Sequence, residues 1–532
     1  MPTLTRLTVL LALSLTGVLC ADDWPQWRGP LNSGFSATAT PPLEWSESKN
    51  LAWKREIEGN GTSSPIVLGD KVFLTTAVNT GEVDPSLPRP EDQPERVFGI
   101  KHPNTSYQLI AMCIHRDTGE LLWRDIAKTY VPHEGHHKDA SFASSSAATD
   151  GERVFFWFGS GGIYAYDLDG TALWAKDLPP AKVGASLGEG STPAIHDGRL
   201  ILVRDHAGQS TISALDTATG ETLWTTDRQE SNTWATPAIV ERDGVTQVIT
   251  PGTTAVRSYD LADGSLIWQA TGLTNNCAPC PIVRGDTAYC MTGYKGHALL
   301  AIPLTGKGDV TDQIQWRADK GTPYVPSALL YDDQLYFTQS NQGILTSLSA
   351  TDGKELIERT RVPDLSDVYA SPVGADGRVY FVGRKGTTVV LAHDQTFRVL
   401  ATNQLDDRFH ASPAIAGDQI FLRGMDYLYC LQSGATGNGA HAIAAPKLPP
   451  AKVAEPKADP LRDLLVQIAQ RPVPEDYPGG AKHQSFVDAE IAKFTSEQKQ
   501  KIGTLWKAQQ RLFPDTKKKG LAFIRILDHV RQ

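Results

Sequence analysis

One short phrase recurs eight times along this chain, and it restricts the possible folds more than any other feature of the sequence. Each copy has Ser, Thr or Cys, usually followed by Pro, then an apolar run, a Gly/Asp turn and a second apolar run. The copies are 41 to 47 residues apart, except that the first interval is 82 residues long. A constant period of this length indicates stacked supersecondary units. The copies begin at Ser63, Ser145, Ser191, Ala235, Pro279, Pro326, Ala370 and Ala411.

Each repeat contains four candidate strands. The two apolar runs predict a hairpin, a third run precedes a turn such as Asp-x-x-x-Gly, and a fourth ends in Trp in most copies. Four short antiparallel strands per unit are typical of a propeller blade. The sequence therefore predicts an all-β, eight-bladed β-propeller of four-stranded antiparallel blades over residues 22–433. We expect its tryptophans to pack between neighbouring blades as docking residues: Trp53, Trp123, Trp174, Trp224, Trp268 and Trp316.

The two ends of the repeat region predict how the ring closes. The eighth copy stops after its third strand, near Ser433, whereas an unmatched fourth strand, Leu51–Ile57, precedes the first copy. Pairing of Leu51–Ile57 with the strand around Leu428–Leu431 would complete the last blade and leave no open ring end.

The N-terminus is typical of an export signal. Arg6 precedes an apolar run, Leu7–Leu19, that is too short to cross a bilayer. We expect a signal peptide over residues 1–21 and a periplasmic or otherwise exported protein. Lipid attachment at Cys20 is an alternative, although Leu19 stands where a lipoprotein signal has a small residue. No later segment has the length and hydropathy of a membrane helix.

Two further segments depart from the repeat. Residues 434–460 are rich in Ala, Pro and Lys, which predicts a linker, and residues 461–532 have helical periodicity, which predicts an α-helical tail docked on the propeller or on a partner. The Pro-rich insertion over residues 79–107 is either a cap on one face of the ring or mobile surface decoration.

Composition excludes one class of partner. The net charge is −9 and the repeat region has no basic stripe, which disfavours nucleic acid. The sequence has neither a glycine-rich phosphate loop nor a G-x-S-x-G nucleophile motif. We expect a monomer that binds an envelope protein or a small ligand.

Three sequence phrases carry a family resemblance. The phrases DTATGETLW, ending at Trp224, and RDTGELLW, ending at Trp123, resemble the repeat of pyrroloquinoline-quinone (PQQ) propellers. The opening DDWPQWRGP resembles exported bacterial PQQ-binding-like repeat proteins, which are related to the lipoprotein of the outer-membrane β-barrel assembly machinery and, more distantly, to quinoprotein dehydrogenases. The dehydrogenases would imply PQQ between a Trp and a vicinal Cys–Cys disulfide, with Ca²⁺ held by Glu, Asn and Asp. The nearest equivalent in this chain is Cys277-Ala-Pro-Cys280, in which two residues separate the cysteines, and this pair is either a disulfide or two thiols. We therefore assign no site residue of the dehydrogenases to this chain.

The start of each inner strand predicts a central funnel. Residues just before each recurring Ser, Thr or Cys should converge at the mouth of the channel, where they either bind a planar or extended ligand or simply fill the channel. The candidate funnel residues are Glu189, Trp234, Asn276, Tyr324, Tyr369 and His410.

One loop has the side chains of a metal site. His133, His136 and His137 lie within VPHEGHHKDASF, and such a cluster binds zinc or copper when a scaffold fixes it. A hydrated loop beside the channel mouth is the alternative.

Taken together, these features favour an exported β-propeller that acts as a scaffold or binding protein of the cell envelope. The alternative is a PQQ- or metal-dependent oxidoreductase that uses the funnel. No catalytic residue is assigned by the sequence.

Overall fold

The computed structural model describes residues 23–435, 464–465, 467–468, 483–512 and 519–531. Contacts divide the chain into two compact units, Met1–Ala445 and Pro446–Gln532. The first contains a ring of β-sheets and the second contains helices, and each is described by itself. The predicted signal peptide and most of the predicted linker lie outside the described residues.

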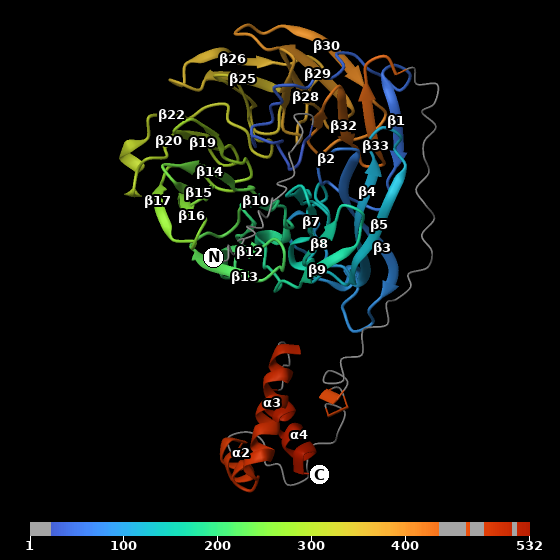
Figure 1. The fold of residues 1–532 in the computed structure, drawn as a ribbon, viewed down its shortest axis with the longest axis vertical. Helices are drawn as coiled ribbons and strands as arrows, with labels where there is room; N and C mark the ends of the chain where they lie inside the picture. The colour runs from blue at the N-terminus through green and yellow to red at the C-terminus, as the bar shows by residue number, and fades with distance from the viewer. Residues whose placement is uncertain (1–22, 436–463, 466, 469–482, 513–518, 532) are drawn as a thin grey trace, which may run out of the picture. The chain divides into compact units, whose positions relative to one another are not determined.

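Eight sheets form the ring, and Figure 1 looks onto it. Blades 1 to 4 comprise β2 (Ile66–Leu68), β3 (Lys71–Val83), β4 (Thr105–His115) and β5 (Leu121–Tyr130); β6 (Ala148–Thr149), β7 (Arg153–Trp157), β8 (Ile163–Asp167) and β9 (Ala172–Lys176); β10 (Ala194–His196), β11 (Arg199–Arg204), β12 (Ser210–Asp216) and β13 (Thr222–Arg228); and β14 (Ala238–Arg242), β15 (Val245–Thr250), β16 (Val256–Asp260) and β17 (Leu266–Ala270).

Blades 5 to 8 continue the same order. They comprise β18 (Ile282–Arg284), β19 (Thr287–Thr292), β20 (Ala298–Pro303) and β22 (Trp316–Ala318); β23 (Leu329–Tyr331), β24 (Gln334–Thr338), β25 (Ile344–Ser349) and β26 (Glu355–Arg361); β27 (Val373–Ala375), β28 (Arg378–Val382), β29 (Thr387–Ala392) and β30 (Val399–Gln404); and β31 (Ala414–Ala416), β32 (Gln419–Arg423), β33 (Tyr427–Gln432) and β1 (Leu51–Glu56). The predicted eight-bladed propeller is confirmed, with one addition: β21 (Gly308–Asp309) pairs parallel to β17 as a fifth strand of blade 4.

Short 3₁₀ turns interrupt several connections between strands. They are η1 (Pro90–Asp92), η2 (Val97–Gly99), η3 (Gly159–Gly161), η4 (Gly184–Ser186) and η5 (Thr311–Gln313).

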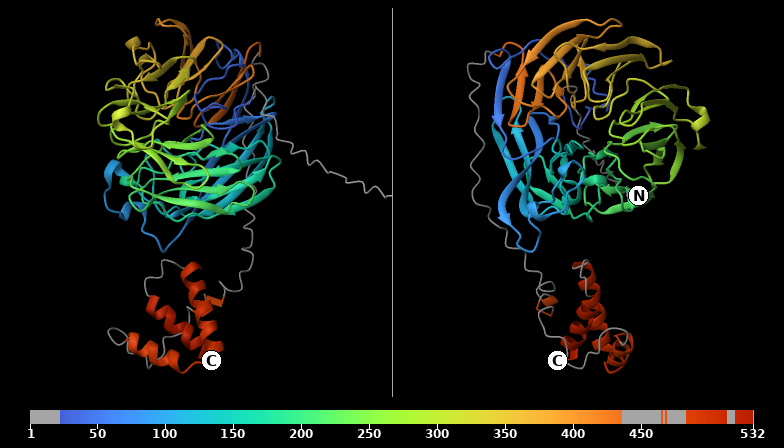
Figure 2. Two further views of the ribbon diagram at one scale, coloured as in Figure 1. Left: turned by 60° about the vertical axis from the view of Figure 1, so that its left-hand side comes forward. Right: turned by 180° about the vertical axis from the view of Figure 1, so that it is seen from behind.

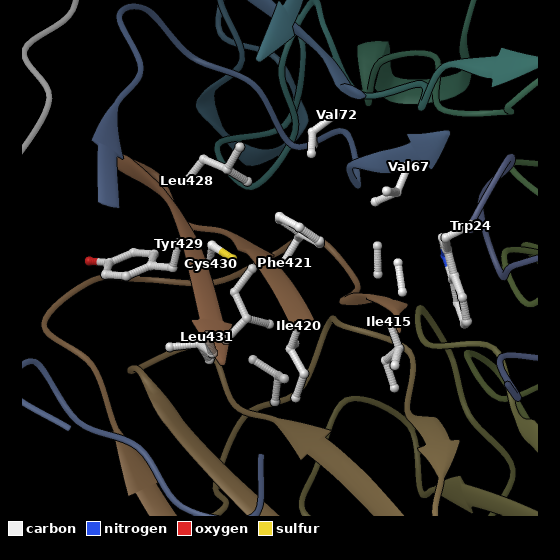
Figure 3. Packing of buried hydrophobic residues seen from close by; sticks show 14 of the residues in the cluster. Trp24, Val67, Val72, Ile415, Ile420, Phe421, Leu428, Tyr429, Cys430 and Leu431 are labelled. Carbon is white, nitrogen blue, oxygen red and sulfur yellow. The ribbon is translucent and has the colours of Figure 1, made fainter. Parts of the chain in front are cut away.

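The ring closes by pairing the two ends of the repeat region, as the sequence predicts. β1 lies antiparallel to β33, with Trp53 opposite Cys430 and Arg55 opposite Leu428. Both views in Figures 1 and 2 show the blue β1 beside the orange β33. Figure 3 shows the apolar core at this closure, where Leu428 and Phe421 of blade 8 lie toward Val72 of blade 1. The last blade is therefore completed by the first strand of the chain.

A closed circle of hydrogen bonds links the eight innermost strands. In each blade, the backbone N–H of the recurring Ser, Thr or Cys donates to the side chain of the equivalent residue in the next blade, over 2.8 to 3.1 Å. These N–H groups are buried, so each needs an acceptor. The circle explains why the repeat always has a hydroxyl or thiol at this position. Its members in order are Ser64, Ser146, Thr192, Thr236, Cys280, Ser327, Ser371 and Ser412, which donates back to Ser64.

We predict that Cys280→Ala lowers the free energy of unfolding by about 1–3 kcal/mol, because it leaves the buried N–H of Thr236 without its acceptor. Cys280→Ser keeps an acceptor and should stay close to the wild type. Denaturant unfolding measures both, and Cys290→Ala, which removes a buried thiol outside the circle, controls for lost volume. Equal losses for Cys280→Ala and Cys280→Ser would contradict this role.

Indole rings dock six of the eight blades onto the next, since the outer strands of blades 6 and 7 contain no Trp. Trp174 of blade 2 donates its Nε1–H to the carbonyl of Thr217 in blade 3, over 2.9 Å, and covers Gly220, where a Cβ would lie 2.6 Å from the ring. Trp53, Trp123 and Trp224 make the same type of N–H bond into the next blade, and Trp316 covers Gly353. Trp268 differs, since its N–H bonds Gln247 in its own blade, although its ring packs against blade 5.

We expect Gly220→Ala to destabilise the propeller more than Gly377→Ala. Both glycines have a positive φ, 72° and 68°, so a side chain costs about 1–2 kcal/mol at either position. At Gly377, however, nothing lies within 4 Å of the new Cβ, whereas at Gly220 the methyl group would push against Trp174. The difference between the two variants in denaturant unfolding isolates the docking contact. Indistinguishable variants would show that the indole moves aside at no cost.

The second unit has a core of its own. It contains α2 (His483–Ala492), α3 (Ser496–Leu512) and α4 (Lys519–Arg531), whose apolar side chains pack together around Ile502, Leu505 and Leu527. Helical structure agrees with the predicted tail. Among the described residues, no helix combines the length and the hydropathy that a membrane crossing requires.

Candidate functional site

A cavity of about 430 Å³ lies on one side of the hydrogen-bonded circle. Five members of the circle line it, and so do all six funnel candidates. Each candidate lies two to four residues before a member of the circle, in the segment that leads into an innermost strand. The structure thus brings together residues from blades that are far apart in the sequence. The candidates are Glu189, Trp234, Asn276, Tyr324, Tyr369 and His410.

Aromatic rings form much of the cavity wall. The indole of Trp234 is held by a 2.7 Å hydrogen bond from Nε1–H to the carbonyl of Gly188. Tyr294 and Tyr324 stack with their ring centroids 4.8 Å apart and their planes at 28°. Trp27, from the N-terminal segment, also lines the cavity. The cavity therefore offers several π faces to a planar ligand.

A charged cluster occupies another part of the wall. The Arg384 guanidinium contacts the Asp139 carboxylate at 2.5 Å and the Asp367 carboxylate at 2.9 Å, and its Nε–H donates to His410 Nε2 over 3.1 Å. The Tyr369 hydroxyl donates to Asp139 over 3.1 Å, and Arg384 lies over the Tyr369 ring at 4.3 Å. The single guanidinium of Arg384 thus bridges the two carboxylates of Asp139 and Asp367.

The protonation states follow from these contacts. Burial and the positive charge of Arg384 lower the pKa of His410, so its neutral imidazole accepts the hydrogen from Arg384. Burial acts to raise the pKa of Asp139, but Arg384 and the Tyr369 hydroxyl outweigh it and hold that pKa below its ordinary value. Burial and the nearby Asp139 raise the pKa of Tyr369 to about 12. At neutral pH the cluster therefore contains an ionised Asp139, a neutral His410 and a neutral Tyr369.

The loop that carries Asp139 extends from blade 1 past blade 8 to blade 7. It follows β5, yet Asp139 contacts Arg384 of blade 7, and its carbonyl lies 3.2 Å from His410 Nδ1 near blade 8. Phe98, from the insertion, meets the ring of His137 edge-on with centroids 5.5 Å apart, and both line the cavity. The insertion therefore reaches the cavity mouth, which favours the cap over surface decoration.

Glu189 lies beside blade 2 and is already engaged. Its Oε1 accepts the backbone N–H of Ser160 over 2.7 Å, and its Oε2 lies 4.0 Å from Arg204. Burial lowers the pKa of Arg204, and Glu189 opposes that shift. Glu189 therefore accepts a structural hydrogen bond and also lines the cavity.

The three histidines of the proposed metal site do not share a cavity. His133 Nε2 lies 2.7 Å from the carbonyl of Ala181 and His136 Nδ1 lies 2.8 Å from the carbonyl of His137. His133 and His136 line a separate small cavity of about 40 Å³, whereas His137 lines the funnel. In the described part of the chain, no three His, Cys, Asp or Glu side chains are grouped for metal binding. The metal site stays a prediction without a geometry to support it.

The residues around the funnel do not fit PQQ with Ca²⁺ as the dehydrogenases hold them. Cys277 and Cys280 are free, buried thiols, and burial raises their pKa values to about 12 and about 11. Cys280 is a member of the hydrogen-bonded circle rather than part of a disulfide that faces a quinone. The carboxylate of Asp139 is ion-paired with Arg384 and accepts a hydrogen bond from the hydroxyl of Tyr369.

Sequence reasoning missed several residues of this site. Arg384 follows β28 in a phrase, Gly-Arg-Lys-Gly, that the other repeats lack. Trp27 lies in the N-terminal phrase DDWPQWRGP. This phrase is outside the repeat, so the repeat pattern does not predict that Trp27 lines the cavity. Asp139 lies in the same loop as the three histidines, and no feature of that loop indicates its partnership with Arg384. A charged residue that breaks the pattern of the other copies is the signal that could have identified Arg384.

We predict that the stability contributed by His410 depends on pH. Its pKa in the folded protein lies below the ordinary 6.5, so the unfolded chain binds a proton first as the pH falls. The contribution is complete above about pH 6.5 and is lost as the pH drops through the folded value. The unfolding free energy of the wild type minus that of His410→Gln should therefore decrease between pH 7.5 and pH 5. Parallel curves for the two proteins would contradict the assignment.

Comparison with known proteins adds a family. The family model described as outer membrane protein assembly factor BamB matches residues 109–358, 234–434 and 341–471, which together exceed half of the chain. No curated protein matches the chain.

Several solved structures are similar in fold. BamB from Moraxella catarrhalis is 14% identical over 72% of this chain and 97% of that chain, with a TM-score of 0.48. The quinohemoprotein alcohol dehydrogenase ADHIIG from Pseudomonas putida HK5 is 10% identical over 96% of both chains, with a TM-score of 0.48. The computationally designed Ika8 protein is 12% identical over 71% of this chain and 98% of that chain, with a TM-score of 0.47.

Proposed function

The chain belongs to the family of the outer membrane protein assembly factor BamB, a family of PQQ-like β-propellers. From this premise we propose that it is an exported binding protein whose funnel binds a small, planar ligand. One observation carries the proposal: side chains from separate blades and from the N-terminal segment converge on a single cavity lined by aromatic rings. Its volume of about 430 Å³ falls within the range of small-molecule sites.

The chemistry of the lining favours a flat ligand with polar edges. Trp27, Trp234 and the Tyr294–Tyr324 pair offer faces for stacking. Asn276 and Glu189 add amide and carboxylate oxygens at the wall. A few polar groups among apolar and aromatic ones are what orients a bound small molecule.

The state of the titratable groups favours binding over catalysis. His410 accepts a hydrogen from Arg384 at Nε2, and its Nδ1 lies 3.2 Å from the carbonyl of Asp139, so both ring nitrogens are engaged. Asp139 is held as a carboxylate by Arg384 and Tyr369. A general base needs access to the proton that it removes, and these groups are turned toward one another. The alternative oxidoreductase would require quinone and cation contacts that the funnel residues do not provide.

The exported location is part of the same proposal. It rests on the predicted signal peptide over residues 1–21 and on the family, whose name refers to the assembly of outer membrane proteins. We propose residues 22–433 as the binding unit, with 434–460 as a linker and 461–532 as a helical tail.

Native mass spectrometry of the protein isolated from its own cell envelope tests the funnel. We expect a non-covalent small-molecule adduct on the wild type that is lost from Trp234→Ala. Tyr427→Ala removes an aromatic ring of blade 8 outside the cavity lining and should keep the adduct. Thermal unfolding of each variant establishes that the propeller is intact.

Two results would overturn the proposal. Retention of the adduct by Trp234→Ala would place the ligand elsewhere. A quinone absorbance with bound Ca²⁺ and dye-linked alcohol oxidation would favour the oxidoreductase instead.

A further inference from the structure

The N-terminal segment, residues 23–40, bonds to the innermost strands at the ends away from the funnel, and Trp27 is its one residue that lines the funnel. Trp24 exchanges two backbone hydrogen bonds with Val67 of blade 1, over 2.8 and 2.9 Å, and the carbonyl of Pro25 accepts the N–H of Thr149 in blade 2. Further along, Ser33 bonds Leu330 of blade 6, Gly34 and Ser36 bond Gly374 of blade 7, and Thr40 bonds Gly417 of blade 8. The segment thus covers the inner strand or the adjoining turn of five blades.

The register of the blades explains where these bonds form. In β2, Leu68 and Lys71 flank the hairpin turn, so the preceding residue, Val67, occupies a position whose N–H and C=O point away from β3. Leu330 and Gly374 hold the same position in blades 6 and 7. The N-terminal segment therefore satisfies a row of backbone groups that each blade presents toward the axis.

Blades 3, 4 and 5 present the same groups without a cover. The equivalent residues are Ile195, Ile239 and Val283, each at the outward-pointing position of its hairpin. Within the described residues, their outward N–H and C=O groups have no hydrogen-bond partner. Val67 is fully buried and Leu330 is 7% exposed, whereas Ile195, Ile239 and Val283 are only half-buried.

These three blades line a groove of about 880 Å³. One wall is the N-terminal segment itself, where Leu31 is 65% exposed. Ile195, Ile239 and Val283 lie along the groove together with Leu330. Free edges of β-strands in an apolar groove are where an extended polypeptide adds by backbone pairing.

We propose that this groove binds an extended segment of a partner protein, which continues over blades 3 to 5 the backbone pairing that residues 23–40 make with the other five blades. The occupant's length follows from the same comparison, because residues 33–40 bond blades 6 to 8. A segment of roughly eight residues therefore spans three blades.

The lining also defines the partner's composition. Apolar side chains of the segment would pack against Ile195, Ile239 and Leu31. The charged Asp and Glu side chains that line the groove are Asp150, Asp197 and Asp332, and no Lys or Arg side chain lines it. Each of these carboxylates already contacts a basic side chain of the propeller, Arg153, Arg199 or His393. The apolar lining therefore defines the partner, which is an extended, apolar segment.

The site is separate from the funnel and does not depend on the proposed function, since the hydrogen-bonded circle lies between the two cavities. It takes a polypeptide through main-chain bonds, whereas the funnel takes a small molecule between aromatic rings.

Selection from a random peptide library displayed on phage, with the purified full-length protein immobilised, tests the proposal. We expect enrichment of peptides with alternating apolar residues. Binding of a synthetic copy of the enriched peptide should weaken by about ten-fold or more for Leu31→Glu and for Ile195→Glu. Leu223→Glu, at a 48% exposed position on the outer strand of blade 3, is the matched control and should bind as the wild type does.

Backbone pairing gives a second readout. N-methylation of alternate peptide bonds in the same peptide removes its N–H donors and should abolish binding, while methylation of the intervening bonds should leave it intact. The proposal is overturned if no peptide is enriched, if Leu31→Glu and Ile195→Glu bind as well as Leu223→Glu, or if Trp234→Ala alone removes binding, because the peptide would then occupy the funnel.

Discussion

The circle of eight N–H to side-chain hydrogen bonds is the interaction on which this structure depends. Every member is both donor and acceptor, so each blade is fixed to both neighbours by the same buried contact. The contact requires a short polar side chain at one point of every repeat, and Cys280 satisfies it with sulfur. A ring held in this way has a defined axis, and side chains next to the circle therefore keep defined distances from one another.

Both candidate sites follow from that axis. On one side, the residues before the circle converge on an aromatic cavity. On the other side, the residues after it present backbone groups that the N-terminal segment bonds in blades 1, 2, 6 and 7 and leaves without a cover in blades 3, 4 and 5. Arg28 anchors this segment: it is fully buried and donates to the carbonyls of Pro372 and Ala328 in two different blades. Burial lowers its pKa to about 10, so it stays charged at neutral pH.

The repeat made most of the fold predictable. Blade number, strand order and the pairing of Leu51–Ile57 with the last blade follow from a period and from counting strands at both ends. The convergence of the funnel residues was predictable, because equivalent positions of all eight repeats lie at the same end of the central channel. What could not be predicted lies outside the repeat: the partnership of Asp139 with Arg384 joins two segments without periodicity, and β21 comes from an irregular connection in blade 5. Symmetry specifies equivalent positions, whereas a contact between two unique loops depends on their paths through space.

The pairing of β1 with β33 has a consequence for the order in which the molecule forms. The strand that finishes the last blade is among the first parts of the chain to be synthesised, and its partner, Tyr427–Gln432, is among the last parts of the propeller. Until β33 is in place, β1 contacts blade 1 through Trp53 but has no strand to pair with, and its hydrogen-bonding edge stays available to other chains. Contacts between such distant segments form slowly. Biogenesis therefore includes a period in which the nascent chain needs protection from misassembly, and that period ends only when the circle is complete.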